Sequence, residues 1–431
     1  MKYLCTAPWT HTYVSPQGER RLCCASREES DFQKQYLDSG EQNLNPTFNP
    51  ISLKDHWNSE YMKDIRKRML AGEAIPQCVV CNENVLNLNT YRSYFVDTLF
   101  PHKIQDIIDT TDETGYTTMV PVSYDYRLSN LCNFKCRMCG DQLSSSWEAE
   151  NKLGNRMQGE PWLQPNNRRK ITNFQKEVLE EELQAAVDQD VIEEIYWVGG
   201  EPLMWERHWT IMDQLKDSSN KENITIRYNT NLSRIDYKKY NLFDMLEGFK
   251  AVNICASIDG AGAIGEYIRT GIKWDDWLDN FKKGIYLNEQ YGDDGMVFDV
   301  TLTTPGLFGL KDLFDVVTEL DVKSYFKFTY GFTPNVLMCP DALPKSIVEP
   351  YCNELIEYME SRKTEKTQVY IDSLKNLIER KSFDEQWEGD DLKYGMRNGK
   401  ENLLFLEKIR DQELTFREIL NEPGKEWWDG I

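Results

Sequence analysis

Short runs rich in β-branched and aromatic residues alternate with longer helix-forming runs from about residue 122 onward. The β-rich runs are 122–128, 192–198, 223–229, 252–258, 297–303 and 324–330, and 174–189 is typical of the helix-forming runs between them. Strand–helix alternation predicts parallel βαβ units. Six such units predict an α/β fold built as a partial (β/α)6 TIM-like barrel, and an open doubly wound sheet is the alternative.

In most of these runs the polar residues occupy every second position, so that they share one face of the predicted strand. In a barrel, alternate strand residues face the lumen and the others face the helices. Because helices must bury an apolar strand face, we expect the polar residues to face inward and line a reaction chamber. Strand ends that dip into solvent are the alternative. The polar positions are Asp125, Arg127, Arg227, Asn229, Asn253, Cys255, Ser257, Asp299, Thr301, Thr303, Lys327 and Thr329.

The chain on either side of this region has a different texture. Turn residues and mixed polar runs dominate up to about Pro50, and a helix is then predicted from about 53 to 70. Ser52 suits its N-cap and Gly72 its end, and apolar residues recur every four positions at Trp57, Tyr61, Ile65 and Met69. After about Leu337 the chain is charged and helix-forming. We therefore predict three parts, at residues 1–118, 119–336 and 337–431.

Composition narrows the class of protein. At roughly 150 residues per domain, 431 residues correspond to two or three domains, and 12 Trp, 22 Tyr and 18 Phe argue against disorder. The net charge of 50 − 71 = −21 disfavours broad binding to nucleic acid. No apolar stretch approaches the ~20 residues of a membrane helix, and the start has no apolar core of a secretory signal. We expect a cytoplasmic protein that acts away from membranes.

The chain has 11 cysteines, and in a reducing compartment repeated cysteine spacings indicate metal binding or catalysis. Cys132, Cys136 and Cys139 form a Cys-x3-Cys-x2-Cys loop directly after the run 122–128. A [4Fe–4S] cluster usually has four cysteine ligands, so three leave one iron open for a chelating ligand. Zinc is the alternative, but it needs four ligands and no histidine is nearby. A disulfide plus a thiol is a third possibility.

Further motifs follow in order at the ends of the predicted strands, where barrel enzymes carry their active sites. They are Gly199-Gly200-Glu201-Pro202, Asn229-Thr230-Asn231 and Ser257-Ile258-Asp259-Gly260. Over residues 120–335 the chain resembles the radical S-adenosylmethionine (SAM) enzymes, whose signature is this cysteine loop and a GGEP motif. Met138 departs from the family, which often has an aromatic residue there. The resemblance implies cofactor contacts by Phe134, Met138, Gly199, Gly200, Glu201, Pro202, Asn231, Ser257, Asp259 and Arg269.

Four further cysteines lie in the N-terminal region, where Cys78-Val79-Val80-Cys81 is a generic metal-binding element. Cys5, Gly18 and Cys23 precede it with the spacing Cys-x12-Gly-x4-Cys, and the set resembles the SPASM and twitch extensions of radical SAM enzymes. That resemblance implies an auxiliary [4Fe–4S] cluster on Cys5, Cys23, Cys78 and Cys81. Here the extension precedes the barrel, whereas in the family it usually follows. Neighbouring strand residues point opposite ways, so we expect only one of Cys23 and Cys24 to be a ligand, and the Gly-x4-Cys spacing favours Cys23. A zinc knuckle is the alternative.

The resemblance implies an oxidoreductase or maturase that reductively cleaves SAM to a 5′-deoxyadenosyl radical and abstracts hydrogen from a substrate carbon. The substrate class is a peptide, a protein or a small polar molecule, the auxiliary cluster relays electrons, and the electron donor is a flavodoxin or ferredoxin. Cys255, Asp299 and Lys327 are catalytic candidates, and a Cys255 thiol could donate a hydrogen atom to a substrate radical. Tyr124, Asp125 and Arg227 are further chamber candidates. A zinc-stabilised α/β binding protein and an electron carrier without SAM chemistry are the alternatives.

Overall fold

The computed structural model describes residues 3–27, 48–83, 91–153, 161–329, 331, 335–387, 389–410 and 412–431. The chain forms two compact units that interleave along the sequence. The first comprises Met1–Leu131, Asp141–Arg227 and Tyr240–Ala251, and the second comprises Cys132–Gly140, Tyr228–Lys239 and Val252–Ile431. Among the described residues, no helix is both long and apolar enough to span a membrane.

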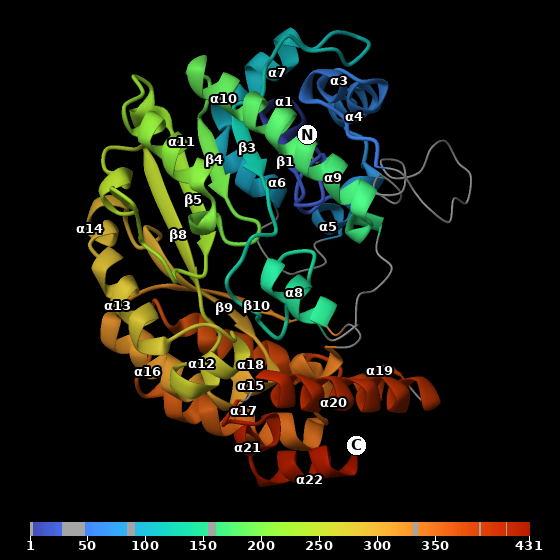
Figure 1. The fold of residues 1–431 in the computed structure, drawn as a ribbon, viewed down its shortest axis with the longest axis vertical. Coiled ribbons are helices and arrows are strands. Elements are labelled where there is room, and N and C mark those ends of the chain that lie inside the picture. The colour runs from blue at the N-terminus through green and yellow to red at the C-terminus, as the bar shows by residue number, and fades with distance from the viewer. Residues whose placement is uncertain are drawn as a thin grey trace. The chain divides into compact units, whose positions relative to one another are not determined.

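The sheet in the first unit has the hydrogen-bonded order β5-β4-β3-β1-β2 (Figure 1). Its strands are β1 (His11–Val14), β2 (Arg20–Arg21), β3 (Ser123–Tyr126), β4 (Glu194–Trp197) and the first half of β5 (Thr225–Thr230). β1, β3 and β4 are parallel, and β2 is antiparallel to β1. The predicted strands at 122–128, 192–198 and 223–229 are confirmed. β1 and β2 were not predicted, because short turn-rich sequence surrounds them.

A tight hairpin joins β1 to β2, and Cys23 follows shortly after β2. The amide of Ser15 donates to the carbonyl of Glu19, and that of Gly18 to Ser15, both at 2.8 Å. Gly18 has φ +81°, and a Cβ there would lie 2.8 Å from the ring of Phe48. Only glycine combines this left-handed backbone with so close a neighbour. The glycine of the Cys-x12-Gly-x4-Cys spacing is therefore the turn residue of this hairpin.

The helices of the first unit follow the predicted periodicity, with breaks. The helix predicted at 53–70 is two helices, α3 (Leu53–Trp57) and α4 (Glu60–Leu70). Ser52 caps α3 as predicted, and Ser59 interrupts the run because its hydroxyl accepts the amide of Met62 and starts α4. The run 174–189 is helical, from the end of α9 (Pro165–Phe174) through a π-helical segment to α10 (Glu180–Asp188). The other helices here are α1 (Ala7–Thr10), α5 (Val79–Asn82), α6 (Tyr91–Ser93), α7 (Ile104–Thr110), α8 (Ser145–Leu153) and α11 (Glu206–Lys216).

The sheet in the second unit has the order β10-β9-β8-β5. β8 (Ala251–Ser257), β9 (Met296–Leu302) and β10 (Ser324–Phe328) are parallel, as the runs at 252–258, 297–303 and 324–330 predicted. The helices between them are α12 (Gly262–Ile268), α13 (Trp274–Gly284), α14 (Leu287–Tyr291), α15 (Thr304–Phe308) and α16 (Leu310–Leu320). The strand–helix alternation of the sequence is confirmed.

The two faces of these strands differ as the parity predicted. Phe298 of β9 contacts Trp277 and Phe281 of α13, with ring centroids 5.1 and 4.4 Å apart. Asp299, the next residue, is in register with Ser257 and accepts a hydrogen bond from Lys327. Helices therefore pack on the apolar parity, and the polar residues share the opposite face.

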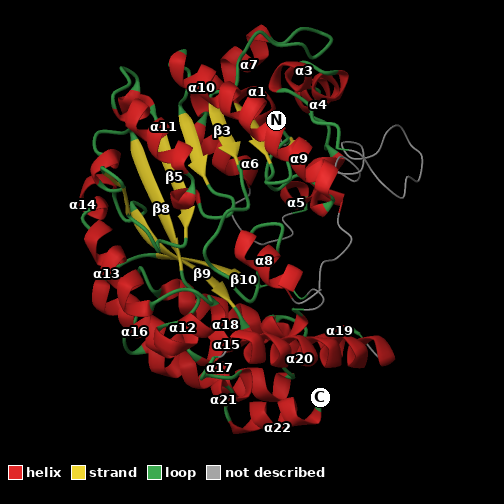
Figure 2. Cartoon of the chain, in the orientation of Figure 1, coloured by secondary structure: helices red, strands yellow, loops and turns green. Residues whose placement is uncertain are grey.

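The C-terminal region is helical, as predicted, in the residues described from 335 to 431 (Figure 2). It contains α17 (Lys345–Glu360), α18 (Gln368–Glu379), α19 (Phe383–Gln386), α20 (Asp390–Arg410), α21 (Phe416–Ile419) and α22 (Glu422–Gly430). Leu337, Phe416 and Trp428 share an apolar core with Tyr267 and Ile268 of α12. The region is thus built onto the strand–helix units of the second unit.

The predicted fold class is confirmed as a mostly parallel α/β fold of the partial-barrel kind. β2 and β10 stand at the two ends of the hydrogen-bonded order, so the sheet is not closed. The boundaries near residues 118 and 336 remain predictions.

Candidate active site

The loop with Cys132, Cys136 and Cys139 lies against the end of α12. The amide of Lys135 donates to the carbonyl of Thr270 and that of Arg137 to Ile268, both at 2.8 Å. Cys136 lies between these two anchored residues, and the amide of Cys139 closes a turn onto the carbonyl of Cys136 at 3.0 Å. The three cysteines are half-buried. Backbone hydrogen bonds on both sides of Cys136 therefore fix the loop.

Polar donors approach two of the three sulfur atoms. Asn231 Nδ2 lies 3.8 Å from Cys132 Sγ, and Arg269 Nη1 lies 3.9 Å from Cys136 Sγ. The amide of Phe134 also donates to Cys132 Sγ, at 3.4 Å. Hydrogen bonds to cysteine sulfurs are one of the means by which proteins set the reduction potential of an iron–sulfur cluster. This donor set fits a cluster, and sequence reasoning had identified Asn231 and Arg269 as cofactor-site residues.

A buried carboxylate fixes the Arg269 side chain. Arg269 Nε lies 2.7 Å from Asp259 Oδ2, and Nη2 donates to Oδ1 at 3.0 Å. The amide of Thr301 also donates to Asp259 Oδ1, at 2.8 Å. Burial lowers the pKa of Arg269, but Asp259 outweighs it and raises that pKa above its ordinary value. A permanent positive charge therefore stands beside Cys136. The predicted residues Asp259 and Arg269 are brought together, while Ser257 lies half-buried at the end of β8.

Sequence reasoning missed Gly271, which lies close against Asn133 and Phe134 of the cysteine loop. Gly271 has φ +115°, and a Cβ would lie 2.9 Å from Phe134 Cδ1 and 3.1 Å from the carbonyl of Asn133. Phe134 is buried, and Met138 packs at the edge of the apolar core shared by α12 and the C-terminal helices. A glycine directly after Arg269-Thr270 was the available signal. The cofactor contacts predicted for Phe134 and Met138 remain predictions.

The GGEP motif belongs to the first unit and pairs with the segment before the cysteine loop. The amide of Gly200 donates to the carbonyl of Ser129 at 3.1 Å, and that of Glu201 to Leu131 at 2.7 Å. A Cβ on Gly200 would lie only 2.4 Å from the carbonyl oxygen of Leu131, which explains the glycine. Glu201 is buried and accepts the amide of Leu203 at 3.0 Å, which caps a short 3-10 turn that begins at Pro202. Gly199, with φ +142°, completes the bend.

The four N-terminal cysteines lie on separate segments of the first unit, and contacts tie these segments to one another. Cys5 and Cys78 share one apolar core, and the amide of Arg27 donates to the carbonyl of Gln77 at 2.8 Å, which ties the segment after Cys23 to the turn that holds Cys78. Burial, with smaller contributions from the charges of Cys78 and Cys81, raises the pKa of Cys5 to about 12. Burial likewise raises the pKa of Cys23, with contributions from Cys24, Cys5 and Cys78.

The environments of Cys23 and Cys24 differ. The pKa of Cys24 is raised to about 11, first by burial and then by the charge of Asp125. Arg127, Arg227 and a hydrogen bond with Tyr91 act in the opposite direction. The charged groups that influence the pKa of Cys24 are therefore Asp125, Arg127 and Arg227, in or next to β3 and β5, whereas those that influence the pKa of Cys23 are cysteines, Cys5 and Cys78 among them. The donor chemistry of Cys5, Cys23, Cys78 and Cys81 fits an all-thiolate cluster. Within the described residues, no three His, Cys, Asp or Glu side chains are grouped so as to hold a single metal ion.

Polar networks cover the polar strand face in both units. In the second unit, Asp299 accepts from Asn229 Nδ2 at 2.8 Å and Lys327 Nζ at 2.7 Å, and Cys255 donates to Asn253 Oδ1 at 3.3 Å. The catalytic roles of Cys255, Asp299 and Lys327 remain predictions.

In the first unit, His11 Nδ1 lies 2.7 Å from the hydroxyl of Ser123, which donates to Glu194, and Arg227 Nη1 donates to Glu194 at 3.3 Å. Burial raises the pKa of Glu194 and lowers that of His11 to about 4, so this histidine is neutral at pH 7. Sequence reasoning found Arg227 but missed His11, Ser123 and Glu194, because β1 was not predicted.

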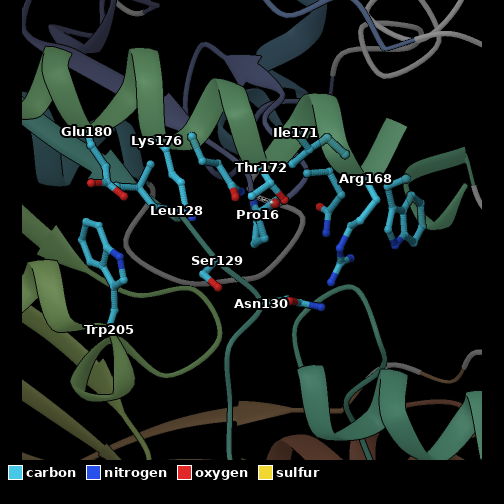
Figure 3. Close-up of a pocket in the computed structure, with 13 residues that line it drawn as sticks. Pro16, Leu128, Ser129, Asn130, Arg168, Ile171, Thr172, Lys176, Glu180 and Trp205 are labelled. Atoms are coloured by element: carbon cyan, nitrogen blue, oxygen red, sulfur yellow. Dashed lines mark hydrogen bonds between the residues drawn. The ribbon is translucent and has the colours of Figure 1, made fainter. Parts of the chain in front are cut away.

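A cavity of about 250 Å³ opens in the first unit beside α9 (Figure 3). Arg168, Thr172 and Lys176 line one wall, and Trp205 and Asn130 lie across from them (Figure 3). Its walls thus offer cations, an indole and amides to a polar ligand. None of the predicted site residues lines it, although Asn130 and Trp205 stand close in sequence to the cysteine loop and to GGEP.

A thiol-rich loop at the ends of parallel strands, with a GGEP turn and a second set of four cysteines, defines an iron–sulfur enzyme of the radical SAM class. Family comparison agrees: residues 126–312 match the radical SAM superfamily, and residues 5–82 match SPASM, an iron–sulfur cluster-binding domain. The chain therefore carries a radical SAM domain over residues 126–312 and, ahead of it in the sequence, a SPASM domain over residues 5–82. Its cofactors are therefore SAM, a SAM-binding [4Fe–4S] cluster and an auxiliary iron–sulfur cluster.

Comparison with solved structures returns SuiB from Streptococcus suis. The SAM-bound structure aligns with a TM-score of 0.37 and 16% identity, over 71% of this chain and 61% of SuiB. SuiB bound to its precursor peptide SuiA aligns with a TM-score of 0.35 and 16% identity, over 77% of this chain and 68% of SuiB. The first alignment thus spans less than two thirds of the SuiB chain. A comparison with curated proteins finds no match.

Proposed function

We propose that this protein is an oxidoreductase or maturase that cleaves SAM reductively and abstracts hydrogen from a carbon of a peptide, a protein or a small polar molecule. In this proposal Cys132, Cys136 and Cys139 ligate the SAM-binding cluster. When bound, SAM and that cluster supply the carbon-centred radical; the protein binds, orients and shields them.

The observation that carries the proposal is the pair of donors on the cysteine loop. Arg269 faces Cys136 from the end of α12, and Asn231 faces Cys132 from the loop after β5. A structural zinc site would not need a guanidinium fixed by a buried carboxylate beside one of its thiolates. A cluster that cycles between two charge states benefits from it, because charge near the sulfurs sets its potential.

The roles of the other predicted residues follow from where they lie. Gly200 lets the GGEP turn approach the backbone at Leu131, and Glu201 is assigned to the SAM ammonium group in this proposal. Asp299 and Lys327 form an ion pair at 2.7 Å on the polar strand face, in which the carboxylate is buried and the lysine is exposed, a suitable place for a polar substrate. The cavity beside α9 is a second place where substrate groups can bind.

We also propose that Cys5, Cys23, Cys78 and Cys81 ligate the auxiliary cluster and that it relays electrons. Four thiolates leave no open iron for substrate, so electron transfer fits better than substrate binding. The buried thiols must lose their protons when the cluster forms, since only thiolates ligate iron. Burial, with the charges of neighbouring cysteines, raises the pKa values of Cys5 and Cys23 and favours their protonated form until then.

The proposal is tested by product analysis after anaerobic reconstitution with iron and sulfide. Dithionite and SAM should yield 5′-deoxyadenosine and methionine with the native chain. The triple variant Cys132→Ala, Cys136→Ala and Cys139→Ala should yield neither product, while Cys352→Ala, which removes a thiol buried in α17, should retain the yield. A native chain that binds zinc and leaves SAM intact would overturn the proposal.

A further inference from the structure

The C-terminal helical region reaches the backbone that carries Cys136. Arg410, the last residue of α20, donates from Nη1 to the carbonyl of Lys135 at 2.9 Å and to the hydroxyl of Thr270 at 3.1 Å. Gln412 donates to the same Thr270 hydroxyl at 3.5 Å. Lys135 immediately precedes Cys136, so these contacts end one residue from a predicted cluster ligand.

A second connection holds the residue after Cys136. The Arg137 side chain is fully buried, with Nε donating to the carbonyl of Tyr267 at 3.0 Å and the guanidinium 3.9 Å from the Tyr267 ring centroid. Its Nη2 donates to Gln412 Oε1. C-terminal side chains therefore hold both neighbours of Cys136.

The same region also fixes the segment that the loop lies against. The Tyr267 hydroxyl donates to Glu407 Oε1 at 2.7 Å, and the amide of Phe416 donates to that oxygen at 2.6 Å. Tyr267 belongs to the segment 267–270, whose carbonyls accept the loop amides and which presents Arg269 to Cys136. A displacement of Glu407 or Arg410 would therefore move Arg269 and the cysteine loop together.

We propose that Glu407, Arg410 and Gln412 form a clamp that positions Cys136 and Arg269 for the SAM-binding cluster. They are positioning residues, and the proposal rests on Cys136 being a ligand, as in the proposed function. Arg410 also adds a second positive charge near Cys136, which favours the more negatively charged, reduced cluster. Such outer contacts orient the ligands of many metal sites and influence how tightly the metal is held. Through these residues the C-terminal region would position the groups around the SAM-binding cluster.

The clamp can be removed without disturbing the core. Arg410 and Gln412 are half-buried and line an open cavity of about 500 Å³, together with Thr270, Gly271 and Leu414. The apolar core around Phe416 and Trp428 does not depend on their side chains. Variants at these two positions should therefore fold.

The test compares Arg410→Met, Arg410→Lys and Gln412→Ala with Arg417→Met in the reconstituted full-length protein. Arg417 is an exposed arginine of the same region, in an ion pair with Asp429 at 2.7 Å. The readouts are the midpoint potential of the EPR signal that changes when SAM is added, and the rate at which a chelator removes iron from that cluster. Arg410→Met should shift the midpoint to more negative values, and Arg410→Lys should retain most of the native value because the charge remains.

Both Arg410→Met and Gln412→Ala should lose iron about tenfold faster than Arg417→Met, a typical effect for outer contacts of a metal site. The auxiliary signal should not change. A native midpoint and native iron loss in both variants would overturn the clamp, and should Arg410→Met not fold, Arg410→Lys and Gln412→Ala decide by the same readouts. A native protein without a SAM-responsive signal would instead overturn the cluster assignment, and the clamp with it.

Discussion

Single residues fall into two groups: those whose chemistry shows in the sequence and those whose surroundings decide it. The cysteines and the GGEP glycines belong to the first group, because thiol ligands and close backbone approach are tied to residue type. His11 and Glu194 belong to the second, because only the pairing of β1 with β3 brings them together through Ser123. Gly271 is intermediate, since its type was visible but its neighbour Phe134 was not.

Three buried histidines predict a loss of stability in acid. Burial lowers the pKa of His11 to about 4 and those of His56 and His208 to about 3, from an ordinary value of 6.5. A lowered pKa in the folded state means that unfolding takes up a proton below pH 6.5, so stability falls as pH falls. Each histidine should cost about 1–2 kcal/mol of unfolding free energy between pH 7 and pH 5.

Urea unfolding of the reconstituted protein at a series of pH values measures this dependence. His208 lies between the rings of Trp197 and Trp209, with centroids 4.8 and 4.9 Å away, and His208→Asn should remove about a third of the histidine contribution. The exposed His102, changed to Gln, is the control and should leave the slope unchanged. Equal slopes of unfolding free energy against pH in the two variants would contradict the contribution assigned to His208. Loss of iron in acid affects both variants alike, so the comparison between them removes it.

Among the elements, the six strands of the barrel were predictable and the hairpin of β1 and β2 was not. Six β-rich runs each bury an apolar parity, which is a strong local signal, whereas β2 has only two residues. β1 nevertheless pairs with β3 over four residues, so the SPASM segment contributes a strand to the sheet of the first unit. This pairing is long-range and leaves no periodicity to detect.

Arg20 of β2 should be essential for attaching the SPASM segment to that sheet. Its buried guanidinium donates to Thr12 Oγ1 at 3.1 Å, the Tyr126 hydroxyl at 3.0 Å and Glu182 of α10 at 2.7 Å. Arg20→Met removes these three hydrogen bonds and the cation that pairs with Glu182, which keeps only its hydrogen bonds from Tyr126 and Leu53. We expect a loss of about 2–4 kcal/mol in unfolding free energy, since Glu182 keeps some solvent contact. Auxiliary iron should be lost before SAM-cluster iron.

Chemical denaturation with iron analysis checks this expectation. Arg68→Met in α4 is the matched control, because Arg68 is partly exposed and its partners Asp64 and Glu73 are exposed, so its loss should cost under about 1 kcal/mol. Similar effects of the two substitutions would contradict the role of Arg20.

Across the whole molecule, the chain combines a radical SAM barrel with a SPASM domain that comes first in the sequence. The Cys-x3-Cys-x2-Cys and Cys-x2-Cys spacings are visible in the sequence because each lies on one loop or one turn, and the two ligand sets built on them remain predictions. The clamp could not be predicted, since Arg410 lies 275 residues from Lys135 and has no motif of its own. All 11 cysteines are free of disulfides, and seven of them are assigned to clusters in the proposed function.

The central claim is that one chain holds two clusters on two separate cysteine sets, and iron counting tests it most directly. Anaerobically reconstituted native protein should contain about eight iron atoms per chain, at four per cluster. The variant without Cys132, Cys136 and Cys139 should contain about four, with loss of the SAM-responsive EPR signal. Unchanged iron in that variant, or zinc in place of iron in the native protein, would contradict the account.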